Sequence, residues 1–103
     1  MIRHQSDKPL FDLGRVVATQ GALEALERAG QRSGAFLLRH QTGDWGDLCD
    51  DDKQLNDEAI AHEGDLKKQS RVLSAYVTKV GDTIWIITEW DRSFTTLLLP
   101  SEY

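Results

Sequence analysis

The sequence predicts an α+β domain in which two or three helices pack on one face of a three-stranded antiparallel sheet. Residues 71–103 contain three runs rich in β-branched and aromatic residues, separated by two short turn signals, which is typical of an antiparallel meander. Residues 19–62 carry apolar side chains at helical spacing together with capping residues. So apolar a sheet must be covered, and these helices are the only cover that the chain offers.

The N-terminal part predicts a leader, a short strand and a helix. Residues 1–10 are polar and include Pro9, so we expect a flexible leader and a single domain over residues 11–103. Residues 14–19 form a β-prone run, and its Val16–Thr19 part is a candidate fourth strand. Thr19 is suited to cap a helix that ends at Gly30, with an inner side made by Ala22, Leu23 and Leu26.

Two further helices are predicted before the sheet. Ser33 can cap a helix through His40, whose inward residues would be Phe36, Leu37 and Leu38. Asp50 can cap a third helix through about His62, with two acidic residues in the first turn, where negative charge meets the positive end of the helix dipole. Its apolar stripe is thin and consists of Leu55, Ala59 and Ile60.

The register of the sheet depends on its two turns. A two-residue turn at Gly81-Asp82 would place Val80 opposite Thr83. The core face would then hold Leu73, Ala75, Val77, Ile84, Ile86, Thr88 and Trp90. The other face would be mixed, and it would be either half covered by the N-terminal segment or open for a partner; it would hold Val72, Ser74, Tyr76, Thr78, Trp85, Ile87 and Glu89.

The second turn, at Asp91-Arg92-Ser93, does not define its own register. A two-residue and a three-residue loop place the third strand's side chains on opposite faces of the sheet. We favour three residues, which sends Leu98 inward beside Ile86. Pro100 ends this strand and suits a strand at the sheet edge.

Charge and cysteine content narrow the function classes. The net charge is −5, and residues 44–58 hold seven acidic residues and one lysine, so the rest of the chain is close to neutral. This distribution argues against nucleic-acid binding through a basic surface. The single Cys49 excludes an internal disulfide and a multi-cysteine zinc site, and it fits a reducing cytoplasm. A secretory signal and a membrane-length apolar run are both lacking, so we expect a cytoplasmic protein without a membrane partner.

Two polar clusters are candidate binding sites. Arg92 at a hairpin tip can contact an anion, with Ser93 and Thr95 as further donors, or it can serve the turn by pairing with Asp91 or Glu89. Trp45 lies between two glycines, where it can stack on a ligand that Asp44 hydrogen-bonds, or fold back as a lid on the core.

No metal or cofactor site is predicted. His40 and Asp44 have a spacing that suits a metal pair on one helix, but Gly43 between them should end the helix. Cys49 lies in an aspartate-rich loop that disfavours its thiolate, so a cysteine nucleophile is not expected either.

Several phrases together resemble a family of small uncharacterised bacterial proteins that are often labelled plasmid-related. They are FDLGRVVAT (11–19), TGDWG (42–46), LSAY (73–76), IWIITE (84–89), DRS (91–93), TT (95–96) and LLPSEY (98–103), and the likeness covers residues 11–103. The resemblance implies a bacterial source and a mobile-element setting. It carries no catalytic residues over to this chain.

The leading hypothesis is a non-catalytic interaction or regulatory module that binds a protein partner. Its candidate groove is lined by Trp45, Tyr76, Trp85 and Arg92, with Asp44 as a further contact. One alternative is a small RNA-cleaving enzyme of the bacterial toxin type, with Arg71, Tyr76 and Arg92 as candidate residues. Another is an acidic DNA mimic built on residues 44–58, in which Asp50, Asp51 and Asp52 would imitate phosphates.

Overall fold

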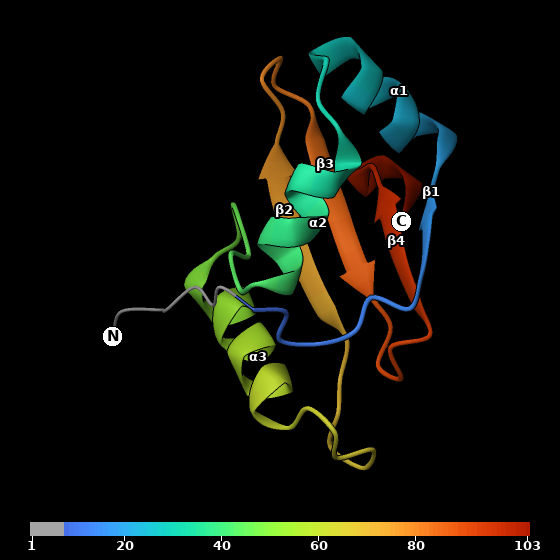
Figure 1. Ribbon diagram of the computed structural model, residues 1–103. Helices are drawn as coiled ribbons and strands as arrows, with labels where there is room; N and C mark the ends of the chain where they lie inside the picture. The colour runs from blue at the N-terminus through green and yellow to red at the C-terminus, as the bar shows by residue number, and fades with distance from the viewer. Residues whose placement is uncertain (1–7) are drawn as a thin grey trace.

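The computed structural model describes residues 8–103, which form three helices and a four-stranded sheet, so the α+β prediction is confirmed (Figure 1). In chain order the elements are β1 (Arg15–Ala18), α1 (Gln20–Ala29), α2 (Ser33–Gln41), α3 (Asp50–Ala61), β2 (Val72–Val77), β3 (Thr83–Thr88), β4 (Phe94–Leu98) and a short 3-10 turn, η1 (Pro100–Glu102). The predicted leader, residues 1–10, lies mostly outside the described residues. Leu10 belongs to the domain, because its N–H donates to the carbonyl of Gln41 at 2.8 Å.

The sheet is mixed rather than wholly antiparallel. Its strand order is β1-β4-β3-β2, and β1 runs parallel to β4 while the other two pairs are antiparallel. The parallel pair is possible because the chain between β1 and β4 includes all three helices, not a hairpin. The expectation that Pro100 follows an edge strand was wrong, since β1 covers the outer side of β4.

Helices α1 and α2 begin and end close to where the sequence predicts. The Thr19 hydroxyl accepts from the N–H of Ala22 at 3.1 Å, and Gly30 ends α1 in the left-handed conformation, with φ 62°. Helix α2 begins at Ser33, but its N-cap is Arg32. Two of the predicted inward residues point to solvent: Leu23 is 49% exposed and Leu38 is 60% exposed. Each helix buries a narrower apolar stripe than its sequence suggests.

Helix α3 lies against the edge of the sheet rather than on its face. The helix begins at Asp50 with Cys49 as its N-cap, and its Leu55 is 62% exposed while Ala59 is buried. The Asn56 side chain donates to the Leu73 carbonyl at 2.6 Å and accepts from the Leu73 N–H at 3.1 Å. Its amide therefore satisfies backbone groups of the edge strand β2, as a neighbouring strand would.

The first hairpin has a longer loop than predicted, and this reverses one strand face. Val77 lies opposite Thr83, so the loop spans residues 78–82, closed by the Thr78 N–H donating to the Asp82 carbonyl at 2.8 Å. The predicted pairing of Val80 with Thr83 was wrong by three positions, and an odd shift moves every β2 side chain to the other face. The inward residues are Val72, Ser74 and Tyr76, not Leu73, Ala75 and Val77.

The second hairpin has the register expected from the two-residue loop, which was the alternative not favoured from the sequence. Ile86 lies opposite Leu97, and Leu98 lies beside Trp85 on the other face. The favoured three-residue loop, which placed Leu98 inward, was wrong. The Glu89 N–H donates to the Phe94 carbonyl at 2.9 Å, which extends the ladder by one pair and leaves residues 90–93 as the loop.

Two apolar clusters fill the space between the helices and the sheet. Helices α1 and α2 contribute Ala22, Ala25, Leu26 and Phe36, which pack on Tyr76, Ile84, Ile86 and Leu97. A second cluster joins Phe11 and Trp45 to Ala59 of α3 and Val72 of β2. We call the covered side of the sheet the helix face. Within residues 8–103, no helix has both the length and the apolar character needed to cross a bilayer.

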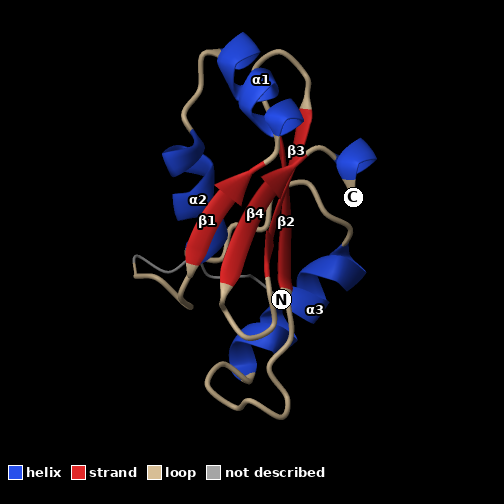
Figure 2. Cartoon of the chain, turned by 90° about the vertical axis from the view of Figure 1, so that its right-hand side faces the viewer, coloured by secondary structure: helices blue, strands red, loops and turns tan. Residues whose placement is uncertain are grey.

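We call the opposite side of the sheet the outer face; it is partly covered, since Ala75, Ile87 and Leu98 are buried there. The strand registers place on it Val17, Leu73, Ala75, Val77, Trp85, Ile87, Phe94, Thr96 and Leu98. In Figure 2, which has β1 and β4 nearest the viewer, α2 lies on one side of the sheet and the C-terminal turn lies on the other. No helix is laid along the outer face among the described residues (Figures 1 and 2).

Candidate binding face

Trp45 is part of the core. It is 3% exposed, its ring lies 6.5 Å from the Phe11 ring in a stacked arrangement, and its indole N–H donates to Asp57 Oδ1 at 2.9 Å. Gly46 permits this position, since its φ is 77° and a side chain there would collide with the Ala75 carbonyl oxygen. Trp45 therefore folds back as a lid on the core, which is one of the two interpretations given in the sequence analysis.

Tyr76 and Asp44 meet on the helix-face side of the β2 edge. Tyr76 is 1% exposed, and its hydroxyl donates to the Asp44 carbonyl at 2.6 Å. Burial raises the pKa of Tyr76 above its ordinary value, so the phenol stays protonated. The Asp44 carboxylate accepts from Arg39 Nε at 2.6 Å, and the Arg39 guanidinium lies 4.5 Å from the centre of the Tyr76 ring.

Arg92 joins the second hairpin to the connector that precedes β2. It is 8% exposed, and its Nη2 lies 2.6 Å from Glu63 Oε1 while its Nε donates to both Glu63 oxygens at 3.1 Å. Its Nη1 donates to the carbonyls of Ser70 at 2.7 Å and Glu89 at 2.9 Å. With φ 61°, Arg92 is the only non-glycine residue of positive φ in the described part of the chain. These hydrogen bonds hold the guanidinium in place and give Arg92 a structural role.

The five predicted site residues therefore do not line one groove. Tyr76 belongs to the helix face, whereas Trp85 belongs to the outer face on the neighbouring strand. Trp45 and Arg92 are both buried beside the Phe11 ring, whose centre lies 6.5 Å from the Trp45 ring and 5.4 Å from the Arg92 guanidinium. Trp85 is the predicted site residue whose side chain lies on the outer face.

A buried chain of hydrogen bonds crosses the core beneath α2, and sequence reasoning missed it. His40 is fully buried; its Nδ1 lies 2.6 Å from Ser74 Oγ and its Nε2 lies 2.9 Å from Thr88 Oγ1. Thr88 Oγ1 lies 2.7 Å from Thr95 Oγ1, which donates to the Leu13 carbonyl at 2.7 Å. The sequence gives no direct signal for it, because Ser74, Thr88 and Thr95 can be assigned to the same face of the sheet only when the register is known.

The carbonyl at the end of this chain fixes the direction of every bond in it. A carbonyl only accepts, so the Thr95 hydrogen is used there and Thr88 must donate to Thr95. Thr88 can then only accept from His40, which places the histidine proton on Nε2 and leaves Nδ1 to accept from Ser74. Burial, with the nearby charge of Arg92, lowers the pKa of His40 from 6.5 to about 3, so the ring is neutral.

Three side chains on the outer face contact one another. The Trp85 and Tyr103 rings meet edge to face with their centres 5.6 Å apart. Arg71 lies over the Tyr103 ring, 5.8 Å from its centre, and its Nη1 donates to the Tyr103 hydroxyl at 2.7 Å. Ile87, on the same face, is only 6% exposed. We call Arg71, Trp85 and Tyr103 the aromatic clasp; sequence reasoning missed it because Tyr103 lies beyond the last strand.

Apolar side chains around the aromatic clasp remain open to solvent. Val17 is 37% exposed, Val77 is 49% exposed and Phe94 is 44% exposed, and they come from three different strands. One end of the face is charged. Arg15 lies beside Phe94, which bonds Glu89 across the second hairpin, and the β2–β3 register continued by one residue places Arg71 opposite Glu89. The outer face thus combines exposed apolar groups with two arginines and one glutamate.

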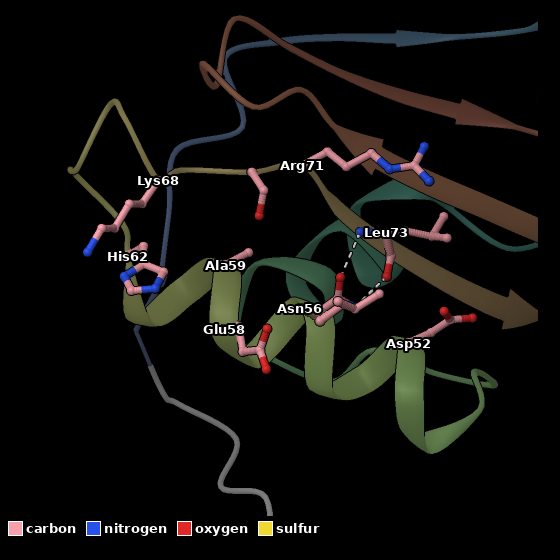
Figure 3. A pocket seen from close by; sticks show the side chains of 10 residues that line it. Asp52, Asn56, Glu58, Ala59, His62, Lys68, Arg71 and Leu73 are labelled. Atoms are coloured by element: carbon pink, nitrogen blue, oxygen red, sulfur yellow. Dashed lines mark hydrogen bonds between the residues drawn. The ribbon is translucent and has the colours of Figure 1, made fainter.

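A groove of about 320 Å³ lies between α3 and the connector that leads to β2. Figure 3 shows that Asn56 and Leu73 are joined across its floor, while His62 and Lys68 lie near one end and Arg71 near the other. Lys68 and Arg71 point away from each other (Figure 3). The charged groups therefore do not converge on a single point where a substrate atom could be held.

Within residues 8–103, no cluster of three or more His, Cys, Asp or Glu side chains is placed to hold a metal ion. Comparisons with known protein families, curated proteins and solved structures give no match, so this face is interpreted from its own geometry.

Proposed function

We propose that this chain is a non-catalytic interaction module that binds a protein partner through the outer face of its sheet. The observation that carries the proposal is the aromatic clasp, which lies among exposed apolar side chains on a sheet face that no helix of residues 8–103 covers. A location in the bacterial cytoplasm is part of the proposal, and it rests on the family resemblance and the single cysteine.

The composition of the face supports protein recognition. Tryptophan, tyrosine and arginine are the residue types that contribute most to binding energy at protein interfaces, and here they contact one another. Most soluble monomers do not leave large clustered apolar patches exposed, and such patches mark interaction surfaces. Here the aromatic clasp and three exposed apolar side chains, Val17, Val77 and Phe94, occur on the same side of the sheet.

The alternatives have weaker support in the geometry. The three residues proposed for an RNA-cleaving enzyme lie apart: Arg71 is on the outer face, Tyr76 on the helix face, and Arg92 is held by Glu63. For an acidic DNA mimic, exposed Asp50, Asp51 and Asp52 occupy only the first turn of α3. Two other acids of that stretch are engaged, since Asp44 accepts from Arg39 and Asp57 from Trp45.

Affinity capture from a bacterial lysate with matched variants tests the proposal. Val77→Asp and Phe94→Asp place a charge on the outer face, whereas Leu38→Asp places one at an exposed apolar site on α2. We expect a protein partner that the wild type and the Leu38 variant retain and that both outer-face variants lose. A partner that all four proteins retain, or that none retains, would contradict the proposal.

A further inference from the structure

Strand β1 forms an open edge of the sheet. The N–H groups of Arg15 and Thr19 donate to main-chain carbonyls on the β4 side, both at 3.0 Å, so these alternate residues turn their backbone toward β4. In a parallel pair the residues between them turn their backbone away, which leaves the N–H and C=O groups of Val16 and Ala18 on the outer side. Within residues 8–103 nothing bonds to these groups, and no helix or strand lies beyond β1 (Figure 1).

The opposite edge of the sheet, at β2, is closed by the chain itself. Both backbone groups of Leu73 bond the Asn56 side chain, and those of Ala75 bond the segment 45–47 at 3.1 and 2.6 Å. Unpaired backbone groups at a sheet edge recruit further strands, so proteins usually block such edges. Strand β1 is short and carries one charge, on Arg15, but it has neither a proline nor a bulge, so it can still accept a strand.

We propose that this edge pairs with the same edge of a second copy of the chain, antiparallel, with Val17 of the two copies opposite each other at a two-fold axis. Val16 then lies opposite the partner's Ala18, and the two residues exchange N–H to C=O hydrogen bonds on both sides of the axis. Val16 is 43% exposed and Val17 is 37% exposed in the single chain, so the pairing also buries apolar side chains. This surface is separate from the one in the proposed function and does not depend on it.

The charges of the edge fit the two-fold arrangement. The pairing places Arg15 opposite the partner's Thr19, whose hydroxyl donates to Glu102 of its own chain at 2.6 Å, on the face that carries the C-terminal turn (Figure 2). This hydrogen bond lowers the pKa of Glu102, so the carboxylate is ionised at neutral pH. In the described part of the chain neither Arg15 nor Glu102 forms an ion pair, and Asp91 of the nearby hairpin accepts from Ser93. The dimer supplies the missing partner at both ends.

A second copy is the occupant that these features specify. A strand from another protein can satisfy the backbone groups too, but it needs an apolar residue opposite Val17 and charges of the right sign at its two ends. This chain has that pattern, because Arg15 and Glu102 lie at opposite ends of β1. The pairing is confined to residues 15–19, since Gly14, with φ 63°, turns the chain toward the second hairpin and α1 begins at the other end. So short an interface predicts a weak dimer.

Sedimentation velocity over a range of protein concentrations tests the interface. Val16→Pro removes an N–H that makes no bond within the chain, so the fold should tolerate it while the dimer weakens at least tenfold. Arg15→Glu should also weaken the dimer at least tenfold, and the double variant Arg15→Glu, Glu102→Lys should restore it. Arg32→Glu, at an exposed site before α2, and Val77→Asp, on the outer face, should dimerise like the wild type.

Disulfide formation tests the register. In a Cys49→Ser background, Val17→Cys places two thiols opposite each other, with Cα atoms about 4.5 Å apart, a separation that a disulfide can span. With oxidised glutathione, at a concentration where the wild type associates, we expect this variant to form mostly covalent dimer. Val77→Cys, exposed on the same face but on β2, should stay mostly monomeric.

Each other outcome overturns the inference. A chain that stays monomeric, with no more covalent dimer from Val17→Cys than from Val77→Cys, would show that the edge does not self-associate. Dimerisation that Val16→Pro leaves unchanged would place the interface elsewhere. Failure of the charge exchange to restore the dimer, or stronger cross-linking by Val16→Cys than by Val17→Cys, would contradict the proposed register. A monomer that captures from a lysate a protein that Val16→Pro loses would assign the edge to a foreign strand.

Discussion

Replacing His40 with glutamine should remove much of the acid sensitivity of the fold. The ring is fully buried between Ser74 and Thr88, and burial lowers its pKa to about 3. A glutamine amide offers one acceptor and one donor at similar reach, so it can bond both hydroxyls, but it does not titrate. A comparison of the wild type with His40→Gln therefore measures the effect of protonating this one side chain on stability.

The sign and size follow from the two pKa values. In the unfolded chain the imidazole binds a proton below pH 6.5, whereas in the folded chain it stays neutral until about pH 3. The unfolded state thus binds more protons over this window, and the free energy of unfolding falls as the pH falls from 6.5 to 3. The loss is about 1.4 kcal/mol per pH unit, or about 2 kcal/mol at pH 5.

Urea denaturation followed by tryptophan fluorescence measures this loss, because Trp45 is buried in the folded state. Between pH 7.5 and 5.0 the wild type should lose about 2 kcal/mol more than His40→Gln does, which is about 1–2 M in urea midpoint. His62→Gln is the matched control for the substitution itself, since it replaces an exposed imidazole at the end of α3 with the same side chain.

Equal pH dependence in the wild type and in His40→Gln would refute the reasoning. A second measurement does not depend on the variant folding. In a proton NMR titration of the wild type from pH 8 to 4.5, the His40 ring signals should stay in place. A His40 ring that titrates near its ordinary pKa would show that the core does not hold it neutral.

Two further predictions concern the backbone and the hairpin. Gly46→Ala should destabilise the protein by at least about 2 kcal/mol more than Gly64→Ala in urea denaturation. Both glycines have positive φ, but only at Gly46 would the new methyl group collide, with the Ala75 carbonyl; equal losses would contradict this. Arg92→Lys should cost about 2–3 kcal/mol by the same assay, since the buried guanidinium cannot be replaced by a single ammonium, whereas exposed Arg28→Lys should cost under about 0.5 kcal/mol. A cost for Arg92→Lys as small as that for Arg28→Lys would refute the assignment of Arg92 to the fold.

Local sequence signals predicted the elements well. The Thr19 cap and the Gly30 terminus depend on neighbouring residues and on backbone conformation, so they could be read directly. The apolar, β-branched composition of residues 71–99 predicted three strands for the same reason. The parallel position of β1 could not be predicted, because it depends on a pairing between Arg15 and Phe94 that no local pattern encodes.

Strand register was the main failure, and its cause is specific. Gly81-Asp82 matches a two-residue turn, but Asp82 also forms an ion pair with Arg28 of α1, at 3.2 Å, within a five-residue loop. Rules that relate the sequence of a turn to the length of its loop do not include such a tertiary contact. Once the register moved by three positions, Tyr76 became a core residue and Trp85 remained on the other face. The candidate groove failed for the same reason, since it combined residues from both faces.

The pairing of the first strand with the last also has a consequence for synthesis in the cell. Arg15 emerges from the ribosome long before its neighbour Phe94, and Thr19 long before Glu102, the carboxylate that its hydroxyl bonds at 2.6 Å. At about 5–20 residues per second, the interval is about 4–16 s. For that time β1 has no native neighbour on the sheet, so the four-stranded sheet cannot form until β4 has been synthesised.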